Sequence, residues 1–156
     1  TLTEMDPENK DIYQSNVEAY QKKLSDLDAE YQNMVENAKQ NTLLFADRFP
    51  FRYLTDDYGL NYYAAFSGCS AESEASFKTI TFLAKKVDEL GLNSVFTIEK
   101  SDDRIAQTVI ENTKAKDQNI LVLNSMQSIT AQEIADGTTY LSVMEENLKV
   151  LKEALN

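Results

Sequence analysis

Apolar side chains recur with helical spacing along the first forty residues of the chain. They are separated alternately by four and three positions, which places them on one face of an α-helix. These positions are Tyr13, Val17, Tyr20, Leu24, Leu27, Tyr31, Met34 and Ala38. Asp6 precedes Pro7, and an aspartate N-cap followed by proline is typical of a helix start. The pattern predicts one long helix from about Pro7 to near Lys39.

The apolar stripe of this helix has two interpretations. Three tyrosines on the stripe favour a helix that lies across the body of its own protein. The alternative is a coiled-coil helix that pairs with a partner. Because the predicted helix is much longer than the mean of about 11–12 residues, it is also suited to connect this chain to a structure beyond it.

After residue 40, continuous apolar runs alternate with amphipathic segments. The runs cover residues 42–46, 61–66, 94–98 and 119–123. Runs without polar alternation suit parallel strands that are covered on both faces. The predicted fold class is therefore α/β, with a four-stranded parallel sheet flanked by helices, right-handed crossovers and one long helix before the sheet.

The segments between and after these runs have the apolar spacing of helices. The predicted helices cover about residues 52–58, 74–90, 102–113, 131–136 and 139–155. Ser101 is the expected N-cap of the helix after the third strand. Thr130 and Glu133 match a capping box at the start of the 131–136 helix. Gly91 is the expected C-terminal cap of the 74–90 helix.

Polar residues follow each predicted strand. In open parallel sheets the ligand binds beyond the carboxyl ends of the strands, and here those ends carry Asp47, Glu99, Asn124 and the 67–70 loop with Cys69. Converging acidic oxygens suit a cation. The competing interpretation is that each residue anchors the loop after its strand, and that Cys69 is a small buried apolar residue. Both interpretations stay open on the sequence alone.

Composition excludes several classes of function. The chain has 156 residues and a formal net charge of −11, because 26 acidic residues outnumber 15 basic ones. A surface this negative repels phosphate backbones, so nucleic acid is not an expected partner. The chain has no histidine and one cysteine, which excludes histidine-based triads, internal disulfides and multi-cysteine zinc modules. No apolar run approaches the roughly 20 residues that cross a bilayer.

Five stretches resemble, in order, the motifs of one family. They read D-P-E-N-x-x-x-Y-x-x-N at 6–16, F-P-F-R-Y-L with D-Y-G-L at 49–60, E-A-S at 74–76, E with D-D-R at 99–104, and T-Y-L-S-V-M-E-E-N-L at 139–148. These segments are similar to those of metal-binding ABC transporter substrate-binding proteins, the receptors of the zinc and manganese type. The resemblance covers essentially the whole chain.

The resemblance implies a specific organisation. Family members have two α/β lobes joined by one rigid helix, and they bind metal between the lobes. Residues 1–40 would be the linking helix and residues 41–156 the C-terminal lobe. The N-terminal lobe, which supplies two histidine ligands in the family, would be missing from this chain. Such receptors are extracytoplasmic, on the cell surface or in the periplasm, commonly lipid-anchored, and deliver metal to an ABC transporter permease.

The chain departs from the family at two ligand positions. A family His or Glu aligns with Arg48, which stays protonated and is not a metal ligand. A family aspartate aligns with Asn124, which offers a neutral oxygen. Asp47 is adjacent and can substitute if the loop shifts by one residue. The resemblance thus implies a site for a divalent metal, zinc or manganese, with Asp47, Asn124 and Glu99 as the contributors from this lobe.

The sequence thus predicts a non-enzymatic receptor that captures zinc or manganese for an ABC permease. One alternative is an acidic pocket that holds Mg²⁺ for phosphoryl transfer, or a receiver-like domain phosphorylated on Asp47. Such folds usually open with a strand, and no lysine follows a fifth strand here. A third hypothesis is an interaction protein that uses the tyrosine-striped helix.

Overall fold

A parallel sheet forms the centre of the computed structural model, which describes residues 1–66 and 75–156. Its four strands are β1 (Thr42–Phe45), β2 (Asn61–Ala64), β3 (Ser94–Ile98) and β4 (Asn119–Leu123), in the order β2-β1-β3-β4. All the strand pairs are parallel, so the predicted α/β class is confirmed. From β1 the chain passes first to β2 on one side and then to β3 on the other. The strand order therefore reverses between β1 and β3, so the carboxyl ends of these two strands form a topological switch point.

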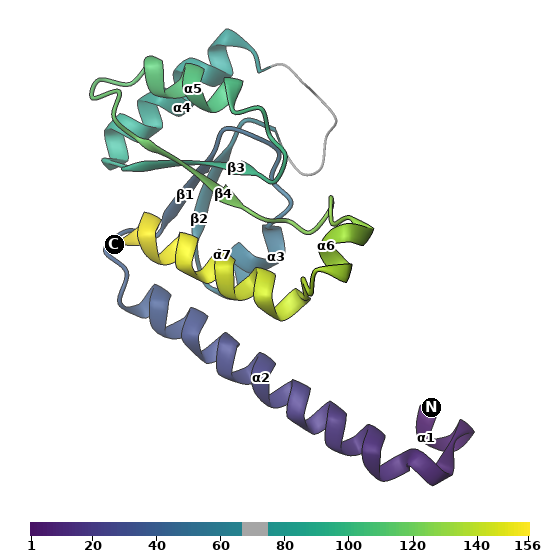
Figure 1. The fold of residues 1–156 in the computed structure, drawn as a ribbon. Coiled ribbons are helices and arrows are strands. Elements are labelled where there is room, and N and C mark those ends of the chain that lie inside the picture. Colours follow the sequence, from purple (N-terminus) through teal and green to yellow (C-terminus); the bar gives the residue numbers. More distant parts are fainter. Residues whose placement is uncertain (67–74) are drawn as a thin grey trace.

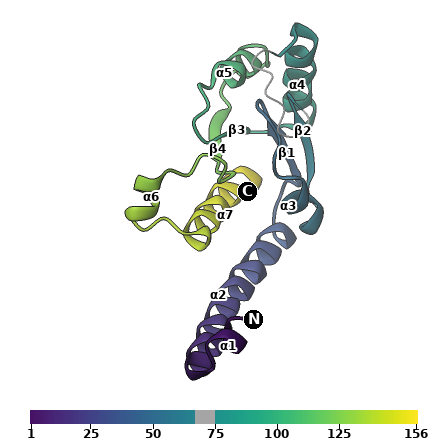
Figure 2. The same cartoon turned by 90° about the vertical axis from the view of Figure 1, so that its right-hand side faces the viewer.

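Helices cover both faces of the sheet. The helices that follow β1 are α3 (Arg52–Asp57), α4 (Phe77–Leu90), α5 (Arg104–Glu111), α6 (Ala131–Ala135) and α7 (Tyr140–Leu155). Helices α4 and α5 lie on one face, and α7 lies on the other with the end of the first long helix (Figures 1 and 2). Leu43 and Phe45 of β1 enter the core under α7, whereas Leu44 enters the core under α4. This two-sided burial explains why the strand is continuously apolar.

The predicted single helix at 7–39 is interrupted near its start. The chain forms α1 (Leu2–Met5), a 3₁₀ turn at Pro7–Asn9, and then α2 (Lys10–Glu36). Asp6 is the N-cap residue of the 3₁₀ turn, as predicted. Its Oδ2 accepts hydrogen bonds from the side chains of Asn9, at 2.9 Å, and Tyr13, at 2.7 Å.

Only the C-terminal half of α2 lies on the body of the protein. Leu27, Tyr31 and Met34 are buried in the core under α7, but Val17 is 54% and Tyr20 is 43% exposed. In both views α2 extends away from the sheet towards α1 (Figures 1 and 2). The preferred interpretation, a helix lying across its own protein, is thus correct only for the last turns. Only these turns pack against α7 and the core beneath it, whereas the earlier turns extend beyond them.

Tyr31 fastens α2 to the body. Its hydroxyl donates a hydrogen bond to the Met144 carbonyl in α7 at 2.7 Å, and its ring stacks on Tyr58 at a centroid distance of 5.0 Å. Burial raises the pKa of Tyr31 well above its ordinary value. Tyr58 in turn donates to Asp28 of α2 at 2.8 Å, so side chains on both sides hold the two segments together.

Two other helices begin later than predicted. α5 starts at Arg104 because Asp103, its N-cap, has a left-handed backbone with φ 57°. Ser101 does not cap this helix, and its hydroxyl accepts a long 3.4 Å hydrogen bond from the Asp103 amide. α4 starts at Phe77 after the N-cap Ser76, and it ends at Gly91 with φ 63°, as the sequence indicates. Glu74, the predicted start, lies outside the described residues.

No helix within residues 1–66 and 75–156 combines the length and apolar character needed to traverse a bilayer.

The hydroxyl of Tyr31 is expected to contribute to stability. We predict that Tyr31→Phe lowers the free energy of unfolding by about 1 kcal/mol, because it removes one buried hydrogen bond and keeps the stacked ring. Urea unfolding followed by circular dichroism measures this. Tyr20→Phe on the exposed half of α2 is the control and should change nothing. Equal unfolding midpoints for the two variants would contradict the assigned role of Tyr31.

Candidate functional site

Asp47 bridges the carboxyl ends of β1 and β3. Its Oδ1 accepts a hydrogen bond from the Arg48 amide at 2.7 Å, and its Oδ2 accepts one from the Ile98 amide, at the end of β3, at 3.4 Å. The side chain is 14% exposed. An ionised carboxylate has about four lone-pair sites, so Asp47 keeps acceptor capacity while it is held at the switch point.

Glu99 ties the loop after β3 to the loop after β4. Its Oε2 accepts from the Ser125 amide at 2.7 Å, and its Oε1 accepts from the Ser125 hydroxyl at 2.8 Å and the Gln127 amide at 3.0 Å. Burial raises the pKa of Glu99, but these donors favour the ionised form more strongly and leave the pKa below its ordinary value. Glu99 is therefore an ionised anchor between two loops.

Asn124 is held on both its side chain and its backbone. Its Oδ1 accepts from the Met126 amide at 2.8 Å, a turn typical of asparagine after a strand. The Asn147 side chain pairs with its backbone: Oδ1 accepts from the Asn124 amide and Nδ2 donates to the Asn124 carbonyl, both at 2.9 Å. Asn147 is only 2% exposed. It fixes the start of the β4 loop from α7.

Asn147 is a residue whose role the sequence reasoning missed. Asn147 belongs to the 139–148 motif, but the sequence assigned it no role. The available signal was a polar side chain next to Leu148 and close to Leu151 on the apolar stripe of α7. A buried amide on such a stripe requires partners, but the sequence does not say that those partners are the backbone groups of Asn124.

The loops at this edge also contain unusual backbone conformations. Lys100, Asp103 and Met126 have φ angles of 62°, 57° and 62°, in a region that non-glycine residues seldom adopt. Asp103 Oδ1 is buried without a hydrogen-bond partner. Strained residues of this kind are found at functional sites. These three follow β3 and β4, whereas Lys116, with φ 59°, lies before β4 at the other end of the sheet.

The three predicted site residues thus follow neighbouring strands at one edge of the sheet. Asp47 and Glu99 are on either side of the switch point, and Asn124 follows the outer strand. The loop-anchoring interpretation is confirmed for Asn124 and for Asp47, which accept from the Met126 and Arg48 amides of their own loops. Glu99 instead anchors the loop after β4. The role of all three as metal ligands stays a prediction. Within residues 1–66 and 75–156 no three His, Cys, Asp or Glu side chains are grouped to hold a metal. Cys69 and the 67–70 loop lie outside the described residues.

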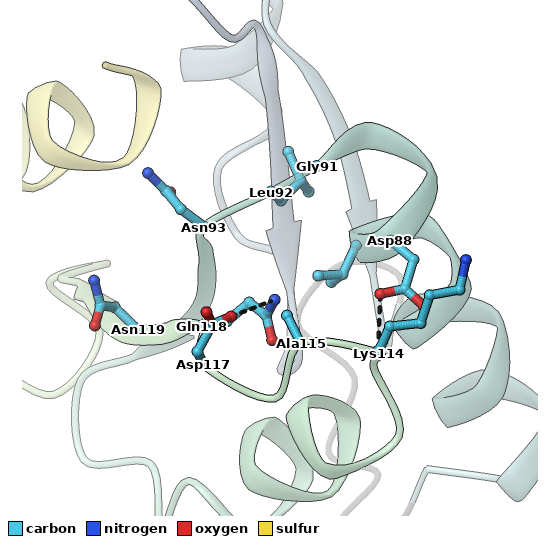
Figure 3. Close-up of a pocket in the computed structure, with 10 residues that line it drawn as sticks. Asp88, Gly91, Leu92, Asn93, Lys114, Ala115, Asp117, Gln118 and Asn119 are labelled. Carbon is cyan, nitrogen blue, oxygen red and sulfur yellow. Dashed lines mark hydrogen bonds between the residues drawn. The ribbon is translucent and has the colours of Figure 1, made fainter.

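Two hollows flank the sheet at opposite edges. One, of about 420 Å³, adjoins the site and is lined by Asn124, Asn147 and Glu146 among others. The other, of about 470 Å³, lies at the amino ends of β3 and β4 (Figure 3). There Asp88 accepts a hydrogen bond from the Lys114 amide at 3.0 Å. The second hollow is therefore separate from the candidate site.

Comparison with known proteins identifies the family. The model of the family "Zinc-uptake complex component A periplasmic" (ZnuA) matches residues 1–154. The chain belongs to the ZnuA family. It is 33% identical over 147 residues to the zinc-binding lipoprotein AdcA of Streptococcus pneumoniae, covering 94% of this chain and 28% of that protein. It is 28% identical over 154 residues to the high-affinity zinc uptake system protein ZnuA of Bacillus subtilis, covering 99% and 47%.

Solved structures of ZnuA-family proteins have the same fold. The Zn(II)-bound ZnuA-like domain of S. pneumoniae AdcA matches with a TM-score of 0.75 and 32% identity, over 99% of this chain and 56% of that one. The metal-dependent lipoprotein YcdH of B. subtilis matches with a TM-score of 0.81 and 26% identity, over 99% and 57%. The predicted resemblance is confirmed, and the chain spans less than half the length of the two curated relatives named above.

Asn147 is expected to stabilise the β4 loop. Asn147→Ala leaves the amide and carbonyl of Asn124 without their side-chain partners, so we predict a loss of roughly 1–3 kcal/mol in the free energy of unfolding. Urea denaturation measures it. Asn112→Ala is the control, because the Asn112 amide is exposed and donates only to the Thr108 carbonyl. A loss no larger than that of the control would contradict the role of Asn147.

The lowered pKa of Glu99 predicts a pH-dependent contribution to stability. Its ionised form stabilises the fold above the ordinary glutamate pKa, and this contribution is lost as the pH falls through the lowered pKa. Glu99→Gln should therefore lower the midpoint of urea unfolding at pH 7. The difference in midpoint from the unmodified protein should become smaller as the pH falls through the lowered pKa of Glu99. Exposed Glu111→Gln is the control. A pH-independent difference between Glu99→Gln and the unmodified protein would contradict this account.

Proposed function

We propose that this chain forms one lobe of an extracytoplasmic receptor that captures zinc and presents it to an ABC permease. The observation that carries the proposal is the topological switch point, where Asp47 and Glu99 follow β1 and β3 in a chain of the ZnuA family. The proposed role is binding and release without catalysis. Relatives named as zinc-binding or zinc-uptake proteins favour zinc over manganese and over the Mg²⁺-dependent phosphoryl-transfer alternative.

The exposed half of α2 supports a two-lobe arrangement. Val17 and Tyr20 lie on its uncovered apolar stripe, and a hollow of about 510 Å³ between α1 and α2 is lined by Leu2, Tyr13 and Val17 among others. Isolated apolar surface of this kind suits burial against another part of a protein. We assign residues 1–40 to a linking helix and residues 41–156 to the C-terminal lobe, with a second lobe covering the free end of α2.

The three residues of the proposed site have different roles. Asp47 keeps lone pairs at the switch point and is the proposed direct metal ligand. Glu99 and Asn124 are the proposed contributors from the β3 and β4 loops, which they also hold in place. The opposing lobe completes the coordination, since a closed zinc site needs about four ligands. A lipid anchor, as in the relative named a lipoprotein, would keep the receptor beside its permease.

Zinc retention tests the proposal. We predict that full-length protein, equilibrated with zinc in a medium that contains small carboxylates and then desalted, retains one zinc ion per chain by elemental analysis. Asp47→Asn should weaken retention about tenfold, equivalent to about 1.4 kcal/mol. Asp117→Asn at the opposite edge of the sheet should retain zinc normally. Failure of the unmodified protein to retain zinc would refute the proposed function.

A further inference from the structure

Arg48 occupies the switch point together with Asp47. It directly follows Asp47, whose carboxylate reaches across to the Ile98 amide at the end of β3. The side chain of Arg48 is 38% exposed, so it is neither buried in the core nor fully in solvent. A permanent positive charge therefore lies at the edge where the proposed cargo binds.

The guanidinium of Arg48 has hydrogen-bond donors to spare. Its Nε lies 3.7 Å from Asp47 Oδ1, which is an ion-pair distance and too long for a hydrogen bond. The other two arginines differ: Arg52 Nε donates to Asp56 at 2.7 Å and Arg104 Nε to Asp102 at 2.6 Å. Among the residues that the structure describes, Arg48 is the arginine whose side chain has no such partner.

Most side-chain oxygens at this edge already accept hydrogen bonds, whereas the Arg48 guanidinium has donors without partners. Both carboxylate oxygens of Glu99 and the side-chain oxygen of Asn124 already accept hydrogen bonds from the β4 loop. Asp47 accepts two hydrogen bonds. A bare zinc ion would meet the positive charge of Arg48 with few free oxygens to offset it. This edge therefore fits a cation poorly unless an anion accompanies it.

A carboxylate anion resolves this conflict. The planar fork of a guanidinium binds carboxylate through two parallel hydrogen bonds, and the remaining oxygens of a multivalent carboxylate can ligate zinc. We infer that zinc is bound at this site as a complex with a small carboxylate anion, and that Arg48 holds the anion while Asp47 contacts the metal. The inference rests on the proposed function, and it names the form in which the cargo is bound.

Calorimetric titration of the full-length protein tests this inference, with citrate as the probe anion. Zinc is titrated in a non-coordinating buffer with and without citrate, at matched concentrations of free Zn²⁺. We expect citrate to raise the apparent zinc affinity about tenfold. Arg48→Gln should abolish that gain. Arg48→Lys, which keeps the charge without the fork, should retain only part of it. Arg104→Gln, whose side chain is exposed and paired with Asp102, is the control and should retain all of it.

The outcomes separate the two proposals. Equal zinc affinity with and without citrate, or a full gain retained by both Arg48 variants, would overturn the anion inference and leave zinc capture intact. Absence of zinc binding in both arms would overturn zinc capture itself, and the inference with it. Thermal melting of each variant shows that it is folded, and Arg48→Lys keeps the test valid should Arg48→Gln not fold.

Discussion

β1 lies between β2 and β3, and the polypeptide passes from β1 to one neighbour and later to the other. The connections after β1 and β3 consequently leave the sheet towards opposite faces: Leu54 of α3 packs in the core under α7, whereas Ile105 of α5 packs in the core under α4. The backbone beyond these two strand ends diverges, so side chains rather than backbone fill the space between them. Asp47 fills it here by bonding to the Ile98 amide. The chemistry of the edge depends on this arrangement.

The strand-end loops are held from the far side of the molecule as well. The side chain of Asn147 in α7 forms hydrogen bonds with the backbone amide and carbonyl of Asn124. The Met144 carbonyl of the same helix accepts a hydrogen bond from the Tyr31 hydroxyl of α2. One stretch of α7 thus contacts both the long helix and the β4 loop.

The sequence predicted the elements that depend on local and periodic signals. The apolar runs of β1 and β3, the capping box at Thr130 and the C-cap at Gly91 were identified correctly. Predictions that depend on single backbone angles were wrong, as at Asp103, because a left-handed aspartate has no distinct sequence signature. The extent of α2 on the body also escaped prediction, since its stripe is apolar in both halves and only the covered half is buried.

The candidate site was predicted in position more than in chemistry. Parallel-sheet topology was enough to bring Asp47, Glu99 and Asn124 to one edge. The sequence did not show that both carboxylate oxygens of Glu99 accept hydrogen bonds from the β4 loop, that Asn147 pairs with Asn124, or that Arg48 lacks the partner that Arg52 and Arg104 have. These facts depend on which donor of a distant loop meets which acceptor, and tertiary packing decides them.

Zinc is proposed to bind beside Asp47, at the carboxyl ends of β1 and β3. Anomalous diffraction at the zinc edge, from crystals of the full-length protein loaded with zinc, locates the metal directly. The account predicts a peak at about 2.0–2.2 Å from a carboxylate oxygen of Asp47. A peak at the opposite edge, in the hollow beside Asp88 and Lys114, with none at Asp47, would contradict it.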